Sequence, residues 1–450
     1  MGLLMALVLA LGALVVLTRW QVVLREDISP GWLGSVWCIR IAAGFCLMAI
    51  YTWYYPDRNT GDTWKYFDDA MKIRSWWSQD PSLTLRFLTG IGLDDPAFTL
   101  WKDQLTGWNT QYTYGLPYDY RMMVRLQLLL SILSFGHYEV HVVLMALAGW
   151  WGSWFAFRAI RPFWPHAPLS LFLLLNLIPT TALWSSGVAK ESPLWLGFGL
   201  ALLVISAGIR NRFGRQHIIP ALFAAALLSA FKPYIGLCMV PSLFSLIIWH
   251  LVHRKRLALV FVSVHALIIL AATTGSWLNP AGDLFYILGK RRDDFYAEAT
   301  NKHARSVVAI PQITNFAEAV MHLPEAMALT YLRPWPGEAE NATTAAAATE
   351  NGLLALLLAL VIPAFRRPRN TDQPFLWFAV SFVVANAVII GFSVPVLGAS
   401  VRYKMAGLMM LIILTGILAR GPQHRILINL FCVLKGPDAA TQDARSSPAE

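Results

Sequence analysis

The sequence predicts an all-α protein that crosses a membrane many times. Of its 450 residues, 56% are hydrophobic and only 14% are charged, and the mean hydropathy is +0.51. Apolar stretches of about 18 to 20 residues recur, which is the length that a helix needs to cross about 30 Å of hydrocarbon. We therefore expect one polytopic transmembrane domain over residues 1–434 and a disordered cytoplasmic tail over 435–450.

Eleven apolar ranges are predicted to be transmembrane helices, and two of them, 218–231 and 352–365, are short. The first range, MGLLMALVLALGALVVL, has no basic start and no cleavage site of small residues, which favours a retained span over a signal peptide. The eleven ranges are 2–18, 33–53, 139–158, 168–185, 192–209, 218–231, 234–252, 258–277, 352–365, 374–394 and 403–419.

Basic residues in the short connections predict the orientation. With eleven spans, all of these clusters fall on one side, and the positive-inside rule makes that side cytoplasmic. The N-terminus is then outside, the C-terminus is inside, and the long loops 54–122 and 278–351 are extracytoplasmic. The net charge of +10 is thus a signal of topology and predicts no nucleic-acid partner. The clusters are Arg158 with Arg161, RNRFGRQH at 210–217, HRKR at 253–256, RRPR at 366–369, and Arg420 with Arg425.

The two long loops hold 18 of the 26 acidic residues but only 13 of the 36 basic ones. This concentration of carboxylates predicts that the chemistry of the protein takes place at the outer face. The sequence has no P-loop, no Rossmann glycine pattern, no HExxH and no GxSxG, so nucleotide-driven transport and zinc proteolysis are not expected. Its four cysteines show neither a metal-binding spacing nor a pair within an outer loop.

The first outer loop begins with a predicted helix that Thr60 or Asp62 can cap. Along this helix Asp62, Tyr66 and Asp69 share one face. One interpretation is an interfacial helix with solvated salt bridges. The other is a catalytic carboxylate at the membrane surface, in which Asp62 accepts a proton or holds a divalent cation such as Mg²⁺ or Mn²⁺.

The segment Gly61-Asp62-Thr63-Trp64-Lys65-Tyr66 resembles the Asp-x-x-x-Tyr signature of GT-C glycosyltransferases. The resemblance implies a GT-C-like fold and an acidic residue that acts on a polyprenyl-phosphate sugar donor. The loop follows the second predicted span here, whereas in that superfamily it usually follows the first, so an additional N-terminal span is implied. The pair Arg402-Tyr403 resembles the Arg-Tyr element near the last spans of many such enzymes. The stretch RPWPGEAEN resembles uncharacterised bacterial membrane proteins associated with polysaccharides.

Several cations are predicted to lie at the outer ends of spans, where ionisable residues are costly and therefore candidates for function. The alternative is that they snorkel to the interface or form internal pairs. An outward cluster of Arg and Lys matches the oxygens of a lipid phosphate. The first choices for phosphate binding are Lys190, Arg402 and Lys404, with Arg121, Arg125, Lys232 and Arg333 as second choices and Tyr403 beside them.

These observations predict a glycosyltransferase of a bacterial inner membrane that uses a lipid-linked sugar in envelope polysaccharide or glycolipid synthesis. Asp62 is the expected base or metal-linked carboxylate, and Asp69 assists it. Trp64, Tyr66 and Trp335 can stack on sugar rings. The expected partners are the lipid-linked sugar, membrane lipids and other polysaccharide-assembly membrane proteins.

Two alternatives remain open: an enzyme like the O-antigen polymerases and ligases, and a flippase or transporter of lipid-linked sugars. The glycosyltransferase interpretation makes one geometric prediction. Asp62, Lys190 and Arg402 should line one cavity that opens outward, because a phosphate site needs positive charge beside the catalytic carboxylate.

Overall fold

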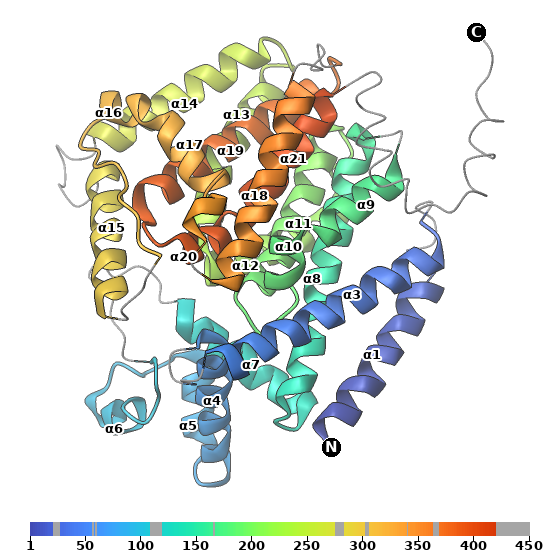
Figure 1. Ribbon diagram of the computed structural model, residues 1–450, viewed down its shortest axis with the longest axis vertical. Helices are drawn as coiled ribbons and strands as arrows, with labels where there is room; N and C mark the ends of the chain where they lie inside the picture. Colours follow the sequence, from blue (N-terminus) through green and yellow to red (C-terminus); the bar gives the residue numbers. More distant parts are fainter. Residues whose placement is uncertain are drawn as a thin grey trace.

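The structure is a computed structural model of the 450-residue chain, and it is a bundle of helices (Figure 1). It describes residues 1–20, 28–55, 58, 61–108, 119–164, 167–274, 283–301, 306–339, 341–362 and 369–419. Within these ranges the extended pairing is limited to an isolated bridge between Val307 and Val396. The predicted cytoplasmic tail lies outside the described residues.

Eight helices in the described part of the chain are long and apolar enough to cross a membrane. Each overlaps one of the predicted spans, because the length and hydropathy of such a helix are local properties of the sequence. The protein is therefore an α-helical polytopic membrane protein. The eight helices are α1 (Gly2–Arg19), α3 (Pro30–Ala49), α8 (Tyr138–Ile160), α11 (Glu191–Ile209), α13 (Pro233–Leu251), α14 (Leu257–Thr274), α18 (Ala342–Val361) and α19 (Gln373–Ser393).

The other three predicted spans are broken or short. The range 168–185 forms α9 (Pro168–Leu177) and α10 (Pro179–Trp184), which are separated at Ile178 because Pro179 lacks the N–H that would continue the helix. The range 218–231 is α12 (Ile218–Phe231). The last range is bent by 58° between α20 (Leu397–Tyr403) and α21 (Met405–Leu418).

Helix α18 corrects the predicted short span 352–365. It begins ten residues earlier, at Ala342, where the Asn341 side chain accepts a hydrogen bond from the Thr344 N–H at 2.9 Å. The alanine-rich stretch after this cap extends the helix to a full span, because alanine has the highest helix propensity although its hydropathy is modest.

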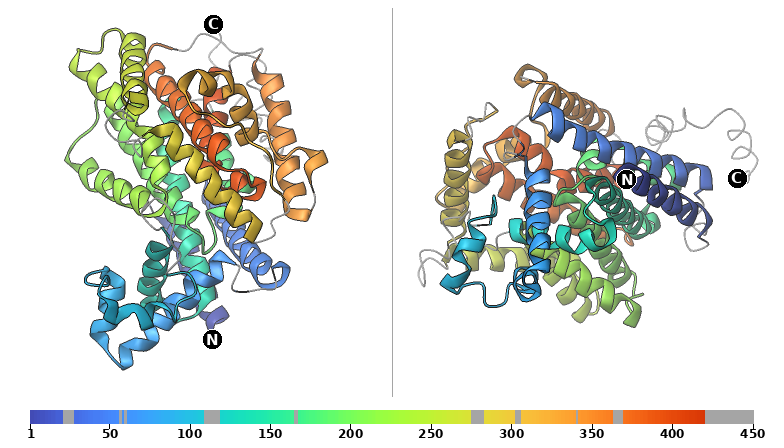
Figure 2. Two further views of the ribbon diagram at one scale, coloured as in Figure 1. Left: turned by 90° about the vertical axis from the view of Figure 1, so that its left-hand side faces the viewer. Right: turned by 90° about the horizontal axis from the view of Figure 1, so that it is seen from below.

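Both long loops, 54–122 and 278–351, which are predicted to be extracytoplasmic, are largely helical where they are described. The elements of the first project beyond one end of the bundle (Figures 1 and 2). They are α4 (Asp62–Ser75), η2 (Trp76–Ser78), α5 (Pro81–Thr89), η3 (Pro96–Phe98), α6 (Thr99–Lys102) and α7 (Asp119–Ser134). The elements of the second are α15 (Leu284–Asn301), α16 (Phe316–Met321), α17 (Leu323–Tyr331) and η8 (Pro336–Glu338).

The core of the bundle is apolar and rich in tryptophan. Trp150 and Trp154 on α8 are stacked with their ring centroids 5.6 Å apart, and Trp195 on α11 is also completely buried. Helix α1 packs on α3, where the Trp37 indole N–H donates to the Ala10 carbonyl at 2.9 Å. Helices α1, α3 and α11 all pack against α8, which is covered by its neighbours along most of its length.

The connections at 210–217 and 253–256, which carry two of the basic clusters, contact each other. Arg254 donates to the Ile209 carbonyl at 3.3 Å and also to the Asn211 side chain. We therefore expect reporter fusions after residues 213 and 435 to be cytoplasmic and fusions after residues 90 and 310 to be extracytoplasmic. A cytoplasmic signal from only one of the fusions at 90 and 310 would contradict the shared outer face.

Candidate functional site

Arg402 joins two carboxylates that are far apart in the sequence. Its Nη1 donates to Asp62 Oδ2 at 3.0 Å, and its Nε donates to Glu191 Oε1 at 2.6 Å. The Arg402 side chain is 11% exposed, and that of Glu191 is 1% exposed. A guanidinium can satisfy two carboxylates at once because its N–H groups form a fixed, planar fork.

Each of the three residues lies at the end of a helix. Asp62 is the first residue of α4 and Glu191 is the first residue of α11, while Arg402 is in the last turn of α20, just before the bend at Lys404. The prediction that Asp62 can cap its helix was wrong. Gly61, which has no side chain to cap with, is the N-cap residue, Thr60 lies outside the described residues, and the Asp62 carboxylate reaches Arg402. An ionic hydrogen bond is stronger than one to a neutral backbone group.

Two lysines complete this group. Lys232 Nζ lies 3.6 Å from Glu191 Oε1 and 3.5 Å from the centroid of the Tyr403 ring. Lys190 Nζ lies 5.4 Å from the centroid of the Tyr66 ring, one helical turn from Asp62. We call Asp62, Lys190, Glu191, Lys232 and Arg402 the outer charge cluster. Its three cations exceed its two carboxylates, which favours an anionic ligand.

Asp62 is the most accessible member of the outer charge cluster. The Asp62 side chain is 38% exposed, whereas the side chains of Arg402, Glu191 and Lys232 behind it are nearly covered. A ligand that approaches from the solvent therefore meets Asp62 first. Glu191 Oε2, which lies deeper in the cluster, is buried and lacks a hydrogen-bond donor among the described residues.

Sequence reasoning did not select Glu191, Trp184 or Tyr51 as site residues. The Arg402 guanidinium lies 5.2 Å from the centroid of the Trp184 ring. Tyr51 belongs to η1 (Ile50–Tyr54), a π-helical turn at the end of α3, and interacts electrostatically with Arg402, Asp62 and Glu191. Turns of π-helix often occur at functional sites, so this turn points to Tyr51. The sequence does not reveal such a turn, and Tyr51 was therefore missed.

Lys404 lies beyond the bend and belongs to a separate network. Its Nζ donates to Asn351 Oδ1 at 2.6 Å and to the carbonyls of Tyr331 and Arg333 at 3.3 and 3.4 Å. These three acceptors match the three N–H groups of an ammonium. The Arg333 side chain is bound by Glu338, and this ion pair lowers the pKa of the Glu338 carboxyl.

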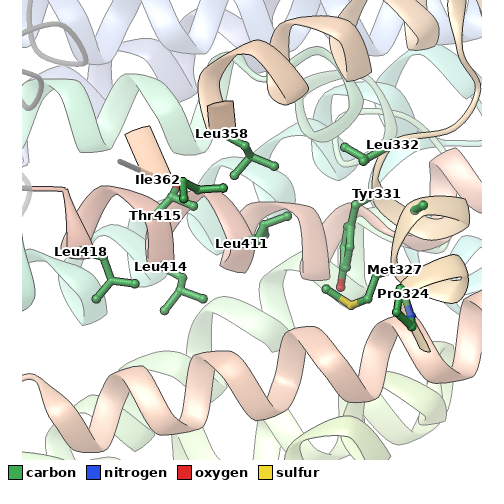
Figure 3. A pocket seen from close by; sticks show the side chains of 11 residues that line it. Pro324, Met327, Tyr331, Leu332, Leu358, Ile362, Leu411, Leu414, Thr415 and Leu418 are labelled. Carbon is green, nitrogen blue, oxygen red and sulfur yellow. The ribbon is translucent and has the colours of Figure 1, made fainter. Parts of the chain in front are cut away.

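An apolar groove begins beside this network and runs along α21 (Figure 3). Its volume is about 300 Å³, and α17, α18 and α21 supply its walls. Tyr331, whose carbonyl binds Lys404, lines one end of the groove, and Leu418 lines the other. A groove of this composition fits a hydrocarbon chain, since its two polar side chains, Tyr331 and Thr415, already donate to backbone carbonyls.

Three predicted site residues stabilise the first outer loop instead. Asp69 is buried and accepts hydrogen bonds from the Thr106 and Gly107 N–H groups and from the Tyr120 hydroxyl, at 2.8, 3.2 and 2.8 Å. In the same unit, the Nε groups of Arg121 and Arg125 donate to the carbonyls of Trp108 and Phe87, at 3.0 and 3.1 Å.

The aromatic candidates differ in their accessibility. Arg58 lies 3.8 Å from the centroid of the Trp64 ring, and Tyr138 is stacked at 3.9 Å, so both faces of Trp64 are covered. Tyr66 is 1% exposed and contacts Tyr120. Trp335 is 39% exposed, which makes it the more accessible of the three for a sugar ring.

The outer charge cluster has two carboxylates that could face a divalent cation, and both of them contact Arg402. In the described part of the chain, no group of three or more His, Cys, Asp or Glu residues is placed to hold a metal ion. Both carboxylates of the cluster are bound to Arg402, which supplies the positive charge that a metal would bring.

Asp62 and Arg402, which were predicted to converge with Lys190, are in direct contact, and Lys190 adjoins them through Tyr66. None of the three lines the groove described above. The chain matches no protein-family model, no curated protein and no solved structure.

Proposed function

We propose that the protein is a membrane glycosyltransferase that transfers a sugar from a lipid-phosphate donor at its outer face. The observation that carries this proposal is the contact of Arg402 with Asp62, which places a solvent-accessible carboxylate beside an excess of buried cations. A carboxylate can accept the proton of an attacking hydroxyl, and the cations can stabilise the phosphate that leaves.

The apolar groove supports a lipid-linked donor. One end of the groove is lined by Tyr331, whose carbonyl accepts a hydrogen bond from Lys404, and Lys404 is separated from Arg402 by one residue at the bend between α20 and α21. A donor with its hydrocarbon chain in the groove would have its phosphate near this bend. The combination of an apolar groove and a cationic cluster supports a lipid-linked donor over a free sugar nucleotide, which has no hydrocarbon chain for the groove.

The proposed reaction forms one bond and breaks one. The acceptor hydroxyl oxygen bonds to the anomeric carbon of the sugar, and its proton passes to the Asp62 carboxylate. The bond between the anomeric carbon and the phosphate oxygen breaks, and the lipid phosphate leaves with the electron pair. Arg402 then exchanges its hydrogen bond to Asp62 for one to the phosphate, while Glu191 retains its position on the same guanidinium.

The direct test uses the purified protein in detergent, where no transmembrane gradient exists. The protein is incubated with polyprenyl-phosphate sugars and a lipid extract of the source cells as the acceptor. We expect release of polyprenyl phosphate that persists in EDTA. Movement of intact donor between leaflets of liposomes, without cleavage, would establish the transporter alternative. Cleavage of lipid-diphosphate oligosaccharides alone would establish the polymerase-like alternative.

The groove makes its own prediction within this assay. Ala328→Trp fills the groove, and the loss of about two buried CH₂ groups, at about 0.8 kcal/mol each, should raise the KM for a long-chain donor about tenfold. A donor with a short chain should be affected little. The matched control is Leu222→Trp on the exposed face of α12, and an equal rise in KM for both variants would remove the groove from the proposal.

A further inference from the structure

Arg40 is a completely buried arginine near the middle of α3. Helix α3 is one of the eight long apolar helices, so the guanidinium lies at a depth where an ionised side chain is costly and requires a specific reason. The outer charge cluster does not include Arg40, and sequence reasoning did not select it. The contacts of this side chain therefore call for an explanation of their own.

The hydrogen-bond partners of Arg40 in the structure are all neutral. Its Nε donates to Asn176 Oδ1 on α9 at 3.2 Å, and its Nη2 donates to Ser153 Oγ on α8 at 2.5 Å. Its Nη1 donates to the hydroxyls of Ser185 and Ser186, the second at 3.3 Å. A guanidinium has five N–H donors, so one side chain holds three separate segments of the chain together.

Two of these acceptors lie in the turn between α10 and α11. This turn, residues 185–190, leads from Trp184, which faces Arg402, to Lys190 and Glu191 of the outer charge cluster. Its inner side has little freedom. A Cβ atom on Gly44 of α3 would overlap the Ser186 carbonyl, and a Cβ atom on Gly149 of α8 would overlap the Ser185 carbonyl.

We propose that Arg40 is a positioning residue that fixes the 185–190 turn and thereby places Glu191 and Lys190 around Arg402. The turn is held from inside by Arg40 and contacts Arg402 from outside through Glu191. A displacement of the turn would move the carboxylate that orients the Arg402 guanidinium toward Asp62. The importance of this for catalysis rests on the function proposed above, whereas the positioning itself does not.

Cysteine labelling can test whether Arg40 positions the turn, and it needs no activity assay. Val188, in the turn, is 1% exposed, and the native Cys238 on α13 is equally buried. In a background with Cys38, Cys46 and Cys432 replaced by Ala, Val188→Cys reports on the turn and Cys238 reports on the rest of the bundle. Adding Arg40→Met should raise the maleimide labelling rate of the cysteine at 188 at least tenfold and leave that of Cys238 unchanged.

A second pair of variants covers the case in which Arg40→Met does not fold. The double variant Ser185→Ala, Ser186→Ala removes the acceptors of the turn but leaves Asn176 and Ser153 to bind Arg40, and it should also expose the cysteine at 188. Asn176→Ala is the matched control, because it removes a partner of Arg40 outside the turn, and it should leave that cysteine protected. Continued protection in the double variant, or equal exposure of Cys238, would overturn the proposal.

In an activity assay, the double serine variant should lower kcat with little change in KM for the donor, because the lipid groove is left intact. Unchanged kcat together with exposed cysteine at position 188 would show that the turn does not control the outer charge cluster. If neither the native protein nor any variant releases lipid phosphate, the proposed function is contradicted. The labelling result then still decides whether Arg40 positions the turn.

Discussion

Asp62→Asn should reduce sugar transfer by at least about 100-fold while the protein remains folded. A general base contributes roughly 10² to 10⁴ to the rate of such a step, and asparagine cannot accept the proton. Asparagine has the same shape and keeps an oxygen for the Arg402 N–H, so the packing between α4 and α20 is preserved. Because Asp62 does not cap its helix, the substitution also leaves the start of α4 unchanged.

The measurement is the initial rate of lipid-phosphate release by purified variants of equal monodispersity. Asp80→Asn is a suitable control, since Asp80 caps α5 by accepting from the Ser82 and Leu83 N–H groups and asparagine caps a helix equally well. Asp69→Asn should lower the stability of the first outer loop, in keeping with its three hydrogen bonds. Full activity of Asp62→Asn would remove the basis of the glycosyltransferase proposal.

Glu191→Gln should cost about 3 kcal/mol of folding stability, because it removes one charge from a buried ionic group. The Glu191 carboxylate is 1% exposed and accepts from Arg402 while Lys232 lies 3.6 Å away. Removal of one partner from a buried ionic group leaves the remaining charges uncompensated, at a cost of about 3–5 kcal/mol. Arg402 keeps its ion pair with Asp62 in this variant, which limits the loss of folding stability to the lower end of this range.

Thermal unfolding in detergent measures this effect. Glu338→Gln provides the control, since the Arg333–Glu338 pair has the same chemistry but its Glu338 side chain is 26% exposed. Because this pair is more open to water than Glu191, solvent screens it more strongly, and the melting temperature should fall less than in Glu191→Gln. If both variants unfold at the same temperature as the native protein, Glu191 is not the electrostatic centre of the cluster.

The helices could be predicted from the sequence because crossing a membrane depends on local length and hydropathy. The predicted boundaries fail where hydropathy and helix propensity diverge. The start of α18 is alanine-rich and only moderately apolar, so it lies outside the apolar range 352–365 although it is helical. Proline divides α9 from α10 although the composition on both sides is that of one span.

The candidate site could be predicted only in part. Asp62 and Asp69 share a helix face and a residue type, yet Asp62 contacts Arg402 and Asp69 is enclosed by Thr106, Gly107 and Tyr120. Periodicity gives the direction of a side chain but not the element that packs against it. The same limit applies to Arg40, whose partners lie on three other segments.

The sequence by itself determined that this protein is an all-α membrane protein with most of its acidic residues in two long segments between spans, because burial in hydrocarbon selects for length and composition within each segment. Only the tertiary structure decided which charges meet. Asp62 and Arg402 are 340 positions apart, and their contact exists because α4, α20 and the 185–190 turn pack at one end of the bundle. Ion pairing acts over a few ångströms, so the fold assigns each charge its partner.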